Sequence, residues 1–407
     1  MHHITFRILL ILLAFNVVAE TYFYRTALCK WTKNRALRVL YWVVDAIFIA
    51  FWFFMILGRV DERNLLPESF FQNSTLVYLL IYIPKFIYML FSFPAFFFRM
   101  KDRYGRPRSE GRKGWRRLFF ALGGVAAIYV FYVIGYGGTL GLQKLRTTHF
   151  SIASEEIPPA FDGYRIVHLS DFHLGNMRTM RVMDKLLDSL QTIRPDVILF
   201  TGDLVHAHTG ETARFETLLQ RFAGMAPCYA VLGNHDYGGY ARWKTDAEKE
   251  VNLQELVDFY DHVGWHLLNN RSATLHRGAD SVALIGIENW GHPPYPRRGD
   301  LLAASVGISD GAYRILLSHD PTFWLERVAG HRGIDLTLSG HTHAMQMVFS
   351  VFGKRISPAS AICRAWGGLY EQNGQRLIVN EGIGVALFPY RYGATPEITL
   401  ITLKREP

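Results

Sequence analysis

The chain has 407 residues, half of them hydrophobic, with a formal net charge of +9 and three cysteines. This length is too great for one ordinary domain and suits two. The positive charge is uneven: residues 1–117 carry a net +11 and residues 118–407 a net −2. A nucleic-acid-binding domain would carry its own basic face, so we expect no nucleic-acid partner. Cys29, Cys228 and Cys363 lack metal-type spacing and give no disulfide framework.

Four apolar stretches precede residue 147, and each approaches the ~20 residues that a helix needs to cross a bilayer. Their main polar interruptions, Asp45 and Lys85, lie near a helix end or on a face of the bundle. Buried core helices are the alternative, but the stretches are apolar on all sides and rich in aromatic residues. We therefore expect a transmembrane region of four helices over residues 1–147. The expected spans are residues 4–24, 39–57, 76–98 and 118–142.

The loops between these stretches differ in positive charge. Loop 25–38 has five basic residues and loop 99–117 has nine, whereas loop 59–74 has two. Basic loops stay in the cytoplasm. The pattern predicts a multi-pass protein of the cytoplasmic membrane, with the N-terminus and everything after the fourth span outside the cytoplasm. A cleaved signal peptide over residues 1–19 is the alternative, but it would place the basic loop 25–38 outside.

Beyond residue 147, short apolar runs alternate with amphipathic helical patterns. Strands are predicted at residues 164–170, 196–201 and 228–232, with apolar side chains at three-to-four spacing between them. Further strand-like runs follow more densely up to residue 380. This order predicts an α/β domain over residues 148–407, layered as an αββα sandwich.

Polar side chains follow five of the predicted strands. The motifs are DFH at 171–173, GD at 202–203, GNHD at 233–236, HD at 319–320 and GHTH at 340–343. In α/β folds, ligands bind at the carboxyl ends of strands. Five unrelated polar turns are the alternative, but their shared position makes it the weaker one. The sequence therefore predicts a metal site at one rim of the sheet, made from carboxylates and imidazoles.

The five motifs, in this order, resemble those of the calcineurin-like metallophosphoesterases. Residues 150–175 and 380–400 are most similar to the membrane-anchored, YkuE-type bacterial branch. The resemblance implies two mixed sheets in an αββα sandwich and a metal-dependent phosphoric ester hydrolase of the phosphodiesterase type. It also implies two divalent metal ions per chain. Because the ligands mix nitrogen and oxygen, Mn, Fe or Zn would suit the site.

The resemblance also assigns roles to residues of this chain. His235 matches the catalytic acid beside the phosphate. The residues that match metal ligands are Asp171, His173 and His343 for one ion, Asn234, His319 and His341 for the other, and Asp203 as the bridge between them.

Two positions depart from the family pattern. Many relatives have an acid three residues after the GD motif, where this chain has His206, so Asp236 is a candidate to orient His235 instead. His206 and His208 are either further ligands or, as we expect, solvent-facing turn histidines. The family often has Gly-Gly-Gln after GHTH, and the Ala-Met-Gln found here at 344–346 predicts a bulkier pocket wall.

Two further stretches concern the substrate. In loop 288–300, Arg297 and Arg298 either pair with a phosphate or form a solvated charge pair. The apolar stretch 345–353 either lines a lipid-accepting groove or forms a core strand.

We expect a phosphoesterase tethered in the lipid bilayer. Its substrate would be a phosphodiester or phosphomonoester of an envelope lipid or a lipid-linked phosphate. One alternative is a cytoplasm-facing pyrophosphohydrolase acting on a UDP-2,3-diacylglucosamine-type lipid. The other is a non-catalytic membrane binding protein. The sequence does not indicate the oligomeric state.

Overall fold

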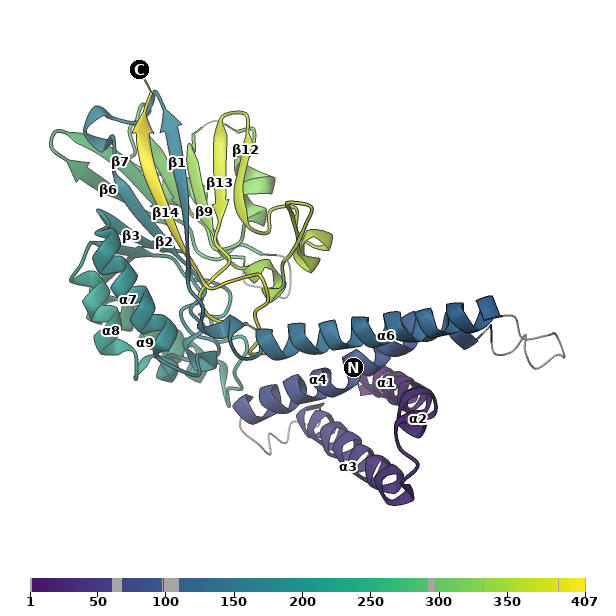
Figure 1. Ribbon diagram of the computed structural model, residues 1–407. Helices are drawn as coiled ribbons and strands as arrows, with labels where there is room; N and C mark the ends of the chain where they lie inside the picture. Colours follow the sequence, from purple (N-terminus) through teal and green to yellow (C-terminus); the bar gives the residue numbers. More distant parts are fainter. Residues whose placement is uncertain are drawn as a thin grey trace. The chain divides into compact units, whose positions relative to one another are not determined.

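The structure is a computed structural model, and its helices and strands are drawn in Figure 1. It describes residues 2–60, 68–96, 98, 110–291, 297–331, 333–386 and 388–406. The chain forms two compact units. The first comprises Met1–Thr139 with Leu387–Tyr390, and the second comprises Leu140–Ala386 with Arg391–Pro407.

The first unit is helical. Among its described residues, three segments are long and apolar enough to cross a membrane: Arg35–Ile56, Phe70–Ser92 and Lys113–Gln143. The first predicted span falls on another helix, α1, and the number of spans stays a prediction. Residues 61–67 and 99–109, which contain much of two predicted loops, lie outside the described residues. The helices are α1 (His2–Phe23), α2 (Cys29–Trp31), α3 (Arg35–Val60), α4 (Glu68–Ser92) and α6 (Glu110–Gly137).

The polar residues of these helices are paired within the unit. Lys85 of α4 lies 2.8 Å from a carboxylate oxygen of Glu20 on α1, and Tyr41 of α3 donates a hydrogen bond to the same carboxylate. The Tyr82 hydroxyl donates to Asp45 at 2.8 Å. Ionisable groups are tolerated among apolar helices when they pair with one another. Glu20 is thus a partner that the sequence analysis did not single out.

The second unit contains two six-stranded sheets. The first has the order β1-β14-β2-β3-β4-β5, and the second has the order β12-β13-β9-β8-β7-β6. Both are mixed, because β14 runs antiparallel to β2 and β12 antiparallel to β13, whereas β2, β3 and β4 are parallel.

The strands of the first sheet are β1 (Arg146–Ser154), β2 (Arg165–Leu169), β3 (Val197–Phe200), β4 (Cys228–Ala230), β5 (Trp265–Leu267) and β14 (Glu397–Arg405). Those of the second are β6 (Arg271–Arg277), β7 (Asp280–Gly286), β8 (Arg314–Leu317), β9 (Leu336–Ser339), β12 (Gly368–Gln372) and β13 (Gln375–Val379). A separate hairpin joins β10 (Phe349–Val351) to β11 (Lys354–Ile356).

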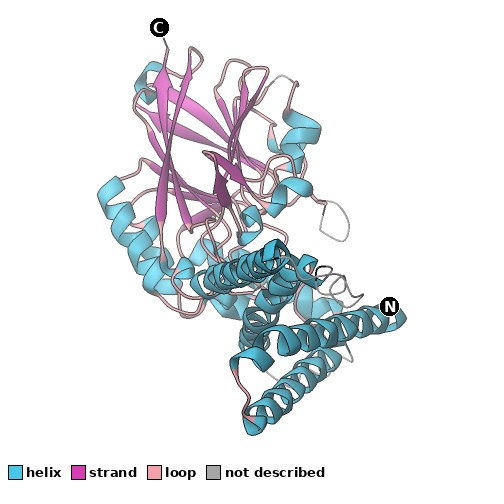
Figure 2. Cartoon of the chain, turned by 45° about the vertical axis from the view of Figure 1, so that its right-hand side comes forward, coloured by secondary structure: helices cyan, strands magenta, loops and turns pink. Residues whose placement is uncertain are grey.

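Alternating side chains of each strand fill different layers of the core. On β3, Val197 and Leu199 belong to the cluster between the two sheets, whereas Ile198 and Phe200 belong to the cluster beneath the helices. Figure 2 shows the two sheets face to face, with helices on both outer sides. The predicted αββα sandwich of two mixed sheets is therefore confirmed. The helices are α7 (Arg181–Ile193), α8 (Glu216–Ala223), α9 (Asp246–His262) and α10 (Leu301–Ala304).

Several elements of this unit were missed from the sequence, among them α9, β1 and β14. Helix α9 has a weak apolar face, since it buries Leu256 and Tyr260 but also Asn252, while its Val251 is exposed. Strands β1 and β14 pair in parallel although they lie at opposite ends of the domain. Such a pairing leaves no local signal, because the partners are some 250 residues apart in the chain.

Candidate metal centre

The candidate ligands lie just beyond the carboxyl ends of strands from both sheets. Asp171 and Asp203 follow β2 and β3 of the first sheet, and His319 and His341 follow β8 and β9 of the second. Backbone hydrogen bonds join neighbouring strand ends, from Asp171 to Gly202 at 2.9 Å and from Gly340 to His319 at 2.9 Å. The site therefore lies at one edge of the sandwich, where both sheets contribute.

One group of ligands consists of Asp171, His173 and His343, all buried. The Nε2 atoms of His173 and His343 lie 2.9 Å apart. An oxygen of Asp171 lies 3.2 Å from Nε2 of His343 and 3.9 Å from Nε2 of His173. Three potential donor atoms thus face one small volume.

A second group consists of Asp203, His319 and His341. Nε2 of His319 lies 3.3 Å from Oδ2 of Asp203 and 3.2 Å from Nδ1 of His341. The amide oxygen of Asn234 lies 3.2 Å from the same Nε2. The Tyr240 hydroxyl accepts a hydrogen bond from the Asn234 amide nitrogen at 2.8 Å, which turns the amide oxygen toward His319.

Asp203 lies between the two groups. Its Oδ2 is 3.3 Å from Nε2 of His319 in the second group and 3.5 Å from Nε2 of His173 in the first. Its other oxygen accepts the backbone N–H of His235 at 2.8 Å. One carboxylate oxygen therefore faces both groups, as a shared ligand must.

The donor atoms suit divalent metal ions in type and in spacing. Ligands at about 2.1 Å from one ion lie roughly 3–3.4 Å from one another in tetrahedral or octahedral geometry. The separations within each group, 2.9 to 3.9 Å, are close to that spacing. Imidazole nitrogens with carboxylate oxygens form a ligand set that Zn, Fe and Mn accept.

Two family models match this chain. The model for the calcineurin-like phosphoesterase matches residues 164–345, and the model for a probable calcineurin-like phosphoesterase transmembrane domain matches residues 6–142. The uncharacterised metallophosphoesterase YkuE of Bacillus subtilis is 30% identical over 277 residues, which cover 66% of this chain and 89% of YkuE. This chain belongs to the calcineurin-like phosphoesterases. It is accordingly a membrane protein and a phosphoric ester hydrolase.

Two other relatives share the similarity. The uncharacterised metallophosphoesterase Cj0846 of Campylobacter jejuni is 24% identical over 402 residues, covering 97% of each chain. The UDP-2,3-diacylglucosamine pyrophosphatase LpxG of Chlamydia trachomatis is 25% identical over 293 residues, covering 60% of this chain and 85% of LpxG.

The backbone of this phosphoesterase is strained at the ligands themselves. Non-glycine residues rarely adopt positive φ, and such strain concentrates at functional sites. Of the seven candidate ligands, five have φ between 44° and 69°. They are Asp171, His173, Asp203, His341 and His343.

The glycines before the ligands serve two purposes. Gly202 has a φ of 95°, which allows a sharp exit from β3. Gly340 instead provides space, because a Cβ there would lie 2.2 Å from a carboxylate oxygen of Asp171. Gly233 also provides space, because a Cβ there would lie 2.2 Å from a carboxylate oxygen of Asp203. A Cβ at Gly202 would also lie 2.4 Å from the backbone nitrogen of Gly233, so close packing requires glycine at all three positions.

Charge coupling sets the protonation of the centre. Burial lowers the pKa of His319, but the carboxylates of Asp203 and Asp171 and the carbonyl of Thr201 together raise this pKa to about 10. Burial raises the pKa of Asp203, yet His319 and His235 together outweigh that effect, and the pKa falls below its ordinary value. The pKa of His173 is well below its ordinary value because of burial and the neighbouring His235. Asp203 is thus ionised and His319 holds a proton that a metal ion would displace.

The His235 ring is fixed by a backbone carbonyl. Its Nδ1 donates to the carbonyl oxygen of His206 at 2.6 Å, which leaves Nε2 for other partners. The Tyr240 ring stacks on the His235 ring, with ring centroids 3.7 Å apart and an interplanar angle of 6°. The His206 carbonyl, rather than the candidate Asp236, bonds the His235 ring. The Asp236 carboxylate instead accepts backbone N–H groups of Asp203, Val205 and Gly233.

The expectation that His206 is a solvent-facing turn residue is wrong. Its ring is half-buried, and its Nδ1 lies 3.5 Å from Nδ1 of His173. Together with His173 and His235, it forms a third cluster with the spacing of a metal site. His208, by contrast, is exposed. The sequence could not separate these two histidines, because only the path of the loop directs His206 inward.

The two arginines of the substrate loop lie on aromatic rings. Arg297 lies 3.8 Å from the Trp290 ring centroid and 3.9 Å from a carboxylate oxygen of Glu326. Arg298 lies 5.0 Å from the Tyr237 ring centroid. Their role toward a phosphate stays a prediction, and residues 292–296 of this loop lie outside the described residues.

One buried residue near the ligands was missed from the sequence. Arg391 donates to the carbonyl oxygens of Gly384, Ala394 and Glu381, and its Nη2 lies 3.0 Å from Nδ1 of His343. The guanidinium thus lies beside the ring nitrogen of His343 that faces away from Asp171 and His173. Local sequence gives no sign of this contact, since Arg391 and His343 are 48 residues apart.

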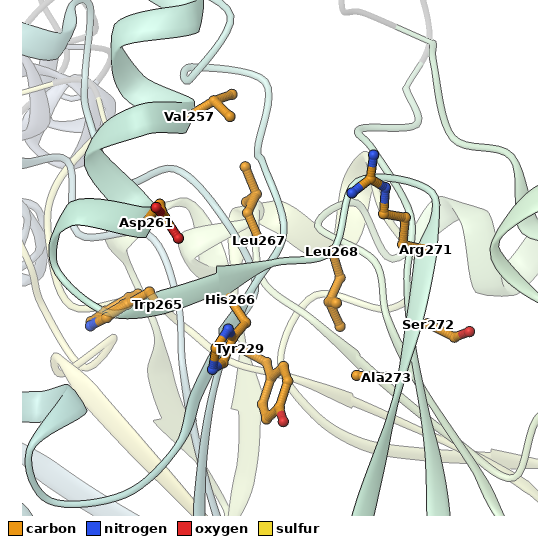
Figure 3. Close-up of a pocket in the computed structure, with 10 residues that line it drawn as sticks. All are labelled: Tyr229, Val257, Asp261, Trp265, His266, Leu267, Leu268, Arg271, Ser272 and Ala273. Atoms are coloured by element: carbon orange, nitrogen blue, oxygen red, sulfur yellow. The ribbon is translucent and has the colours of Figure 1, made fainter.

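A separate hollow of about 510 Å³ lies beside β4, β5 and β6. Figure 3 shows its lining side chains, among them Tyr229, His266 and Arg271. None of its ten lining residues is a candidate ligand. This hollow is therefore distinct from the metal centre.

Proposed function

We propose that this chain is a membrane-tethered phosphoesterase with two divalent metal ions, which hydrolyses a phosphate ester of an envelope lipid or lipid-linked phosphate outside the cytoplasm. Asp171, His173 and His343 would hold one ion. Asn234, His319 and His341 would hold the other, and Asp203 would bridge them. The observation that carries this proposal is the place of Asp203 Oδ2, within 3.5 Å of a histidine nitrogen of each group.

The two ions would supply Lewis-acid stabilisation of the charge on the phosphate, and Mn, Fe or Zn suits their ligands. The protein's own contribution to the leaving group would come from His235. With Nδ1 bonded to the carbonyl of His206, the ring presents Nε2 as the atom that donates a proton to the departing oxygen. Asp236 supports this geometry indirectly, because it binds the backbone of the two loops that carry Asp203 and His235.

The domain boundary and the orientation are part of the proposal. We assign residues 1–147 to the transmembrane region and residues 148–407 to the catalytic domain. The charge of loops 25–38 and 99–117 supports a cytoplasmic location for both loops. One span then separates residue 117 from the catalytic domain, which lies outside the cytoplasm. There it would meet lipid head groups rather than soluble nucleotides.

A second function follows if the domain faces the cytoplasm. The relative named as a UDP-2,3-diacylglucosamine pyrophosphatase supports pyrophosphate hydrolysis of a UDP-linked lipid. Nucleotide-linked substrates are cytoplasmic, so orientation separates the two functions.

The test uses the full-length protein purified in detergent and loaded with Mn²⁺. It is incubated with a bacterial lipid extract, and the products are identified by mass spectrometry. We expect a lipid phosphate ester to be consumed by the parent protein and not by the Asp203→Ala variant, which should also retain less metal by elemental analysis. Full activity and unchanged metal content in Asp203→Ala would contradict the assigned centre.

A further inference from the structure

Exposed apolar side chains gather in the segment that follows the last candidate ligand, His343. Phe352 is 102% exposed and Ile362 is 80% exposed. Four others are between 42% and 49% exposed: Met345, Val351, Ile356 and Leu369. The expectation of a core strand over 345–353 is thus wrong for most of the stretch, although Val348 is buried. Apolar surface concentrated in this way indicates an interaction site.

The most exposed of these residues occupies an unfavourable place. Because Val351 pairs with Lys354, the β10–β11 hairpin turns through only two residues, Phe352 and Gly353. Both have positive φ, 49° and 77°. Turns of this kind favour Asn, Asp or Gly at these positions. Neither local conformation nor burial explains why position 352 is a phenylalanine. The remaining explanation is that this side chain contacts another molecule.

The charge of the segment indicates the kind of molecule. Residues 344–370 contain three basic side chains and no acidic one. Lys354, Arg355 and Arg364 are all exposed. Because cross-strand partners project to one face, Lys354 lies on the same face of the hairpin as Val351. Apolar side chains beside basic ones are typical of elements that bind anionic lipid surfaces.

The hairpin is also attached to the candidate metal centre. The Ser357 hydroxyl, just after β11, donates to the carbonyl oxygen of Ala344 at 2.6 Å, one residue beyond His343. Arg355 forms an ion pair with the buried carboxylate of Glu381. Glu381 in turn accepts, through its backbone carbonyl, a hydrogen bond from Arg391, which contacts His343. The hairpin is therefore held at a fixed position relative to this ligand.

We propose that the β10–β11 hairpin and residues 357–369 form a lipid-binding element that places Phe352 in the head-group region of a bilayer. Its function is to present the phosphate of a membrane-embedded lipid to the metal centre. This second part rests on the proposed function, whereas the insertion of Phe352 does not. The occupant is a lipid surface rather than a protein, because residues 344–370 carry basic side chains and no acidic one.

The first test measures insertion directly in the full-length protein. Cys29 and Cys363 are replaced by serine, and a spin label is attached at Phe352→Cys in nanodiscs that contain anionic phospholipid. The control is Leu302→Cys, because Leu302 of α10 is 87% exposed and lies in another part of the sequence. Buried Cys228 is left unchanged.

We expect the label at 352 to be more accessible to oxygen than to a water-soluble nickel complex, and the label at 302 to show the reverse. Equal exposure of both labels to the nickel complex would overturn the proposal. Dipolar broadening between labels at 352, without access to oxygen, would instead identify a second copy of the chain as the partner and would also overturn it.

The second test concerns the substrate. Phe352→Ser and the control Leu302→Ser are compared on a phospholipid ester in vesicles and on soluble bis(p-nitrophenyl) phosphate. Phe352→Ser removes the proposed contact between the aromatic ring and the lipid. It should therefore lower the ratio of lipid hydrolysis to soluble-substrate hydrolysis by about tenfold, whereas the control should leave this ratio unchanged. An equal loss on both substrates would refute the lipid-presenting role. Failure of the parent protein on both substrates would refute the proposed function, and the spin labels would still decide insertion.

Discussion

A single methyl group at Gly340 should disable the metal centre. An ideal Cβ at this position lies 2.0 Å from the hydroxyl oxygen of Ser170 and 2.2 Å from a carboxylate oxygen of Asp171. Ordinary van der Waals contact begins at 3.4 Å, so the Asp171 carboxylate has to move by about 1.2 Å in the Gly340→Ala variant. That movement would also disturb the hydrogen bond from the backbone N–H of His341 to Asp171, now 3.0 Å long.

The magnitude follows from this displacement. A misplacement of about 1 Å can lower the rate of a positioned reaction about 100-fold. Overpacking a tightly filled interior costs about 1–3 kcal/mol of stability, which most folded domains tolerate. We therefore expect Gly340→Ala to fold, to lose much of its bound metal and to hydrolyse its substrate about 100-fold more slowly.

The assay compares Gly340→Ala with Gly239→Ala. A Cβ at Gly239 meets no atom within 4 Å, although this glycine lies close in sequence to His235. Hydrolysis of bis(p-nitrophenyl) phosphate with added Mn²⁺ gives the rate, elemental analysis gives the metal content, and thermal unfolding reports the fold. Gly239→Ala should behave like the parent protein. If Gly340→Ala also kept its metal and a rate within about threefold of the parent, the argument from close packing would be refuted.

Three further predictions concern the acid, the protons and the orientation. The His235→Asn variant should keep its metal but hydrolyse its substrate about 10²–10⁴-fold more slowly, with a smaller loss for nitrophenyl leaving groups. An equal loss of rate for good and poor leaving groups would exclude the acid role of His235. His319, whose pKa is about 10, is protonated in the metal-free protein at pH 7, and its proton is lost only as the pH rises through that value. Mn²⁺ binding should therefore release about one proton from His319, and the affinity of the protein for Mn²⁺ should rise about tenfold per pH unit between pH 7 and 8. Calorimetry in two buffers that shows no net proton release on Mn²⁺ binding would contradict this prediction. A C-terminal alkaline phosphatase fusion should be active and a green fluorescent protein fusion dark, and the opposite pattern would favour the cytoplasm-facing function.

The sequence by itself determined the family and most of the architecture. Strand patterns between residues 164 and 339 predicted the central strands of both sheets, because buried strands have a local signature in continuous apolar residues. The five motifs that follow these strands contain all seven candidate ligands and His235, which the structure gathers at one edge of the sandwich, but not His206. Their common position, just after a strand, is a local feature that the chain displays before it folds.

Only the tertiary structure decided how the polar groups are shared. Asp236 and His206 both differ from their expected roles: the Asp236 carboxylate binds backbone N–H groups, and the His206 carbonyl holds the His235 ring. Arg391 reaches His343 from a distant segment, and β1 pairs with β14 across the whole domain. These contacts depend on the direction in which each loop leaves its strand. Because residue type alone does not fix that direction, local sequence predicts which residues lie near the site but not which atoms meet there.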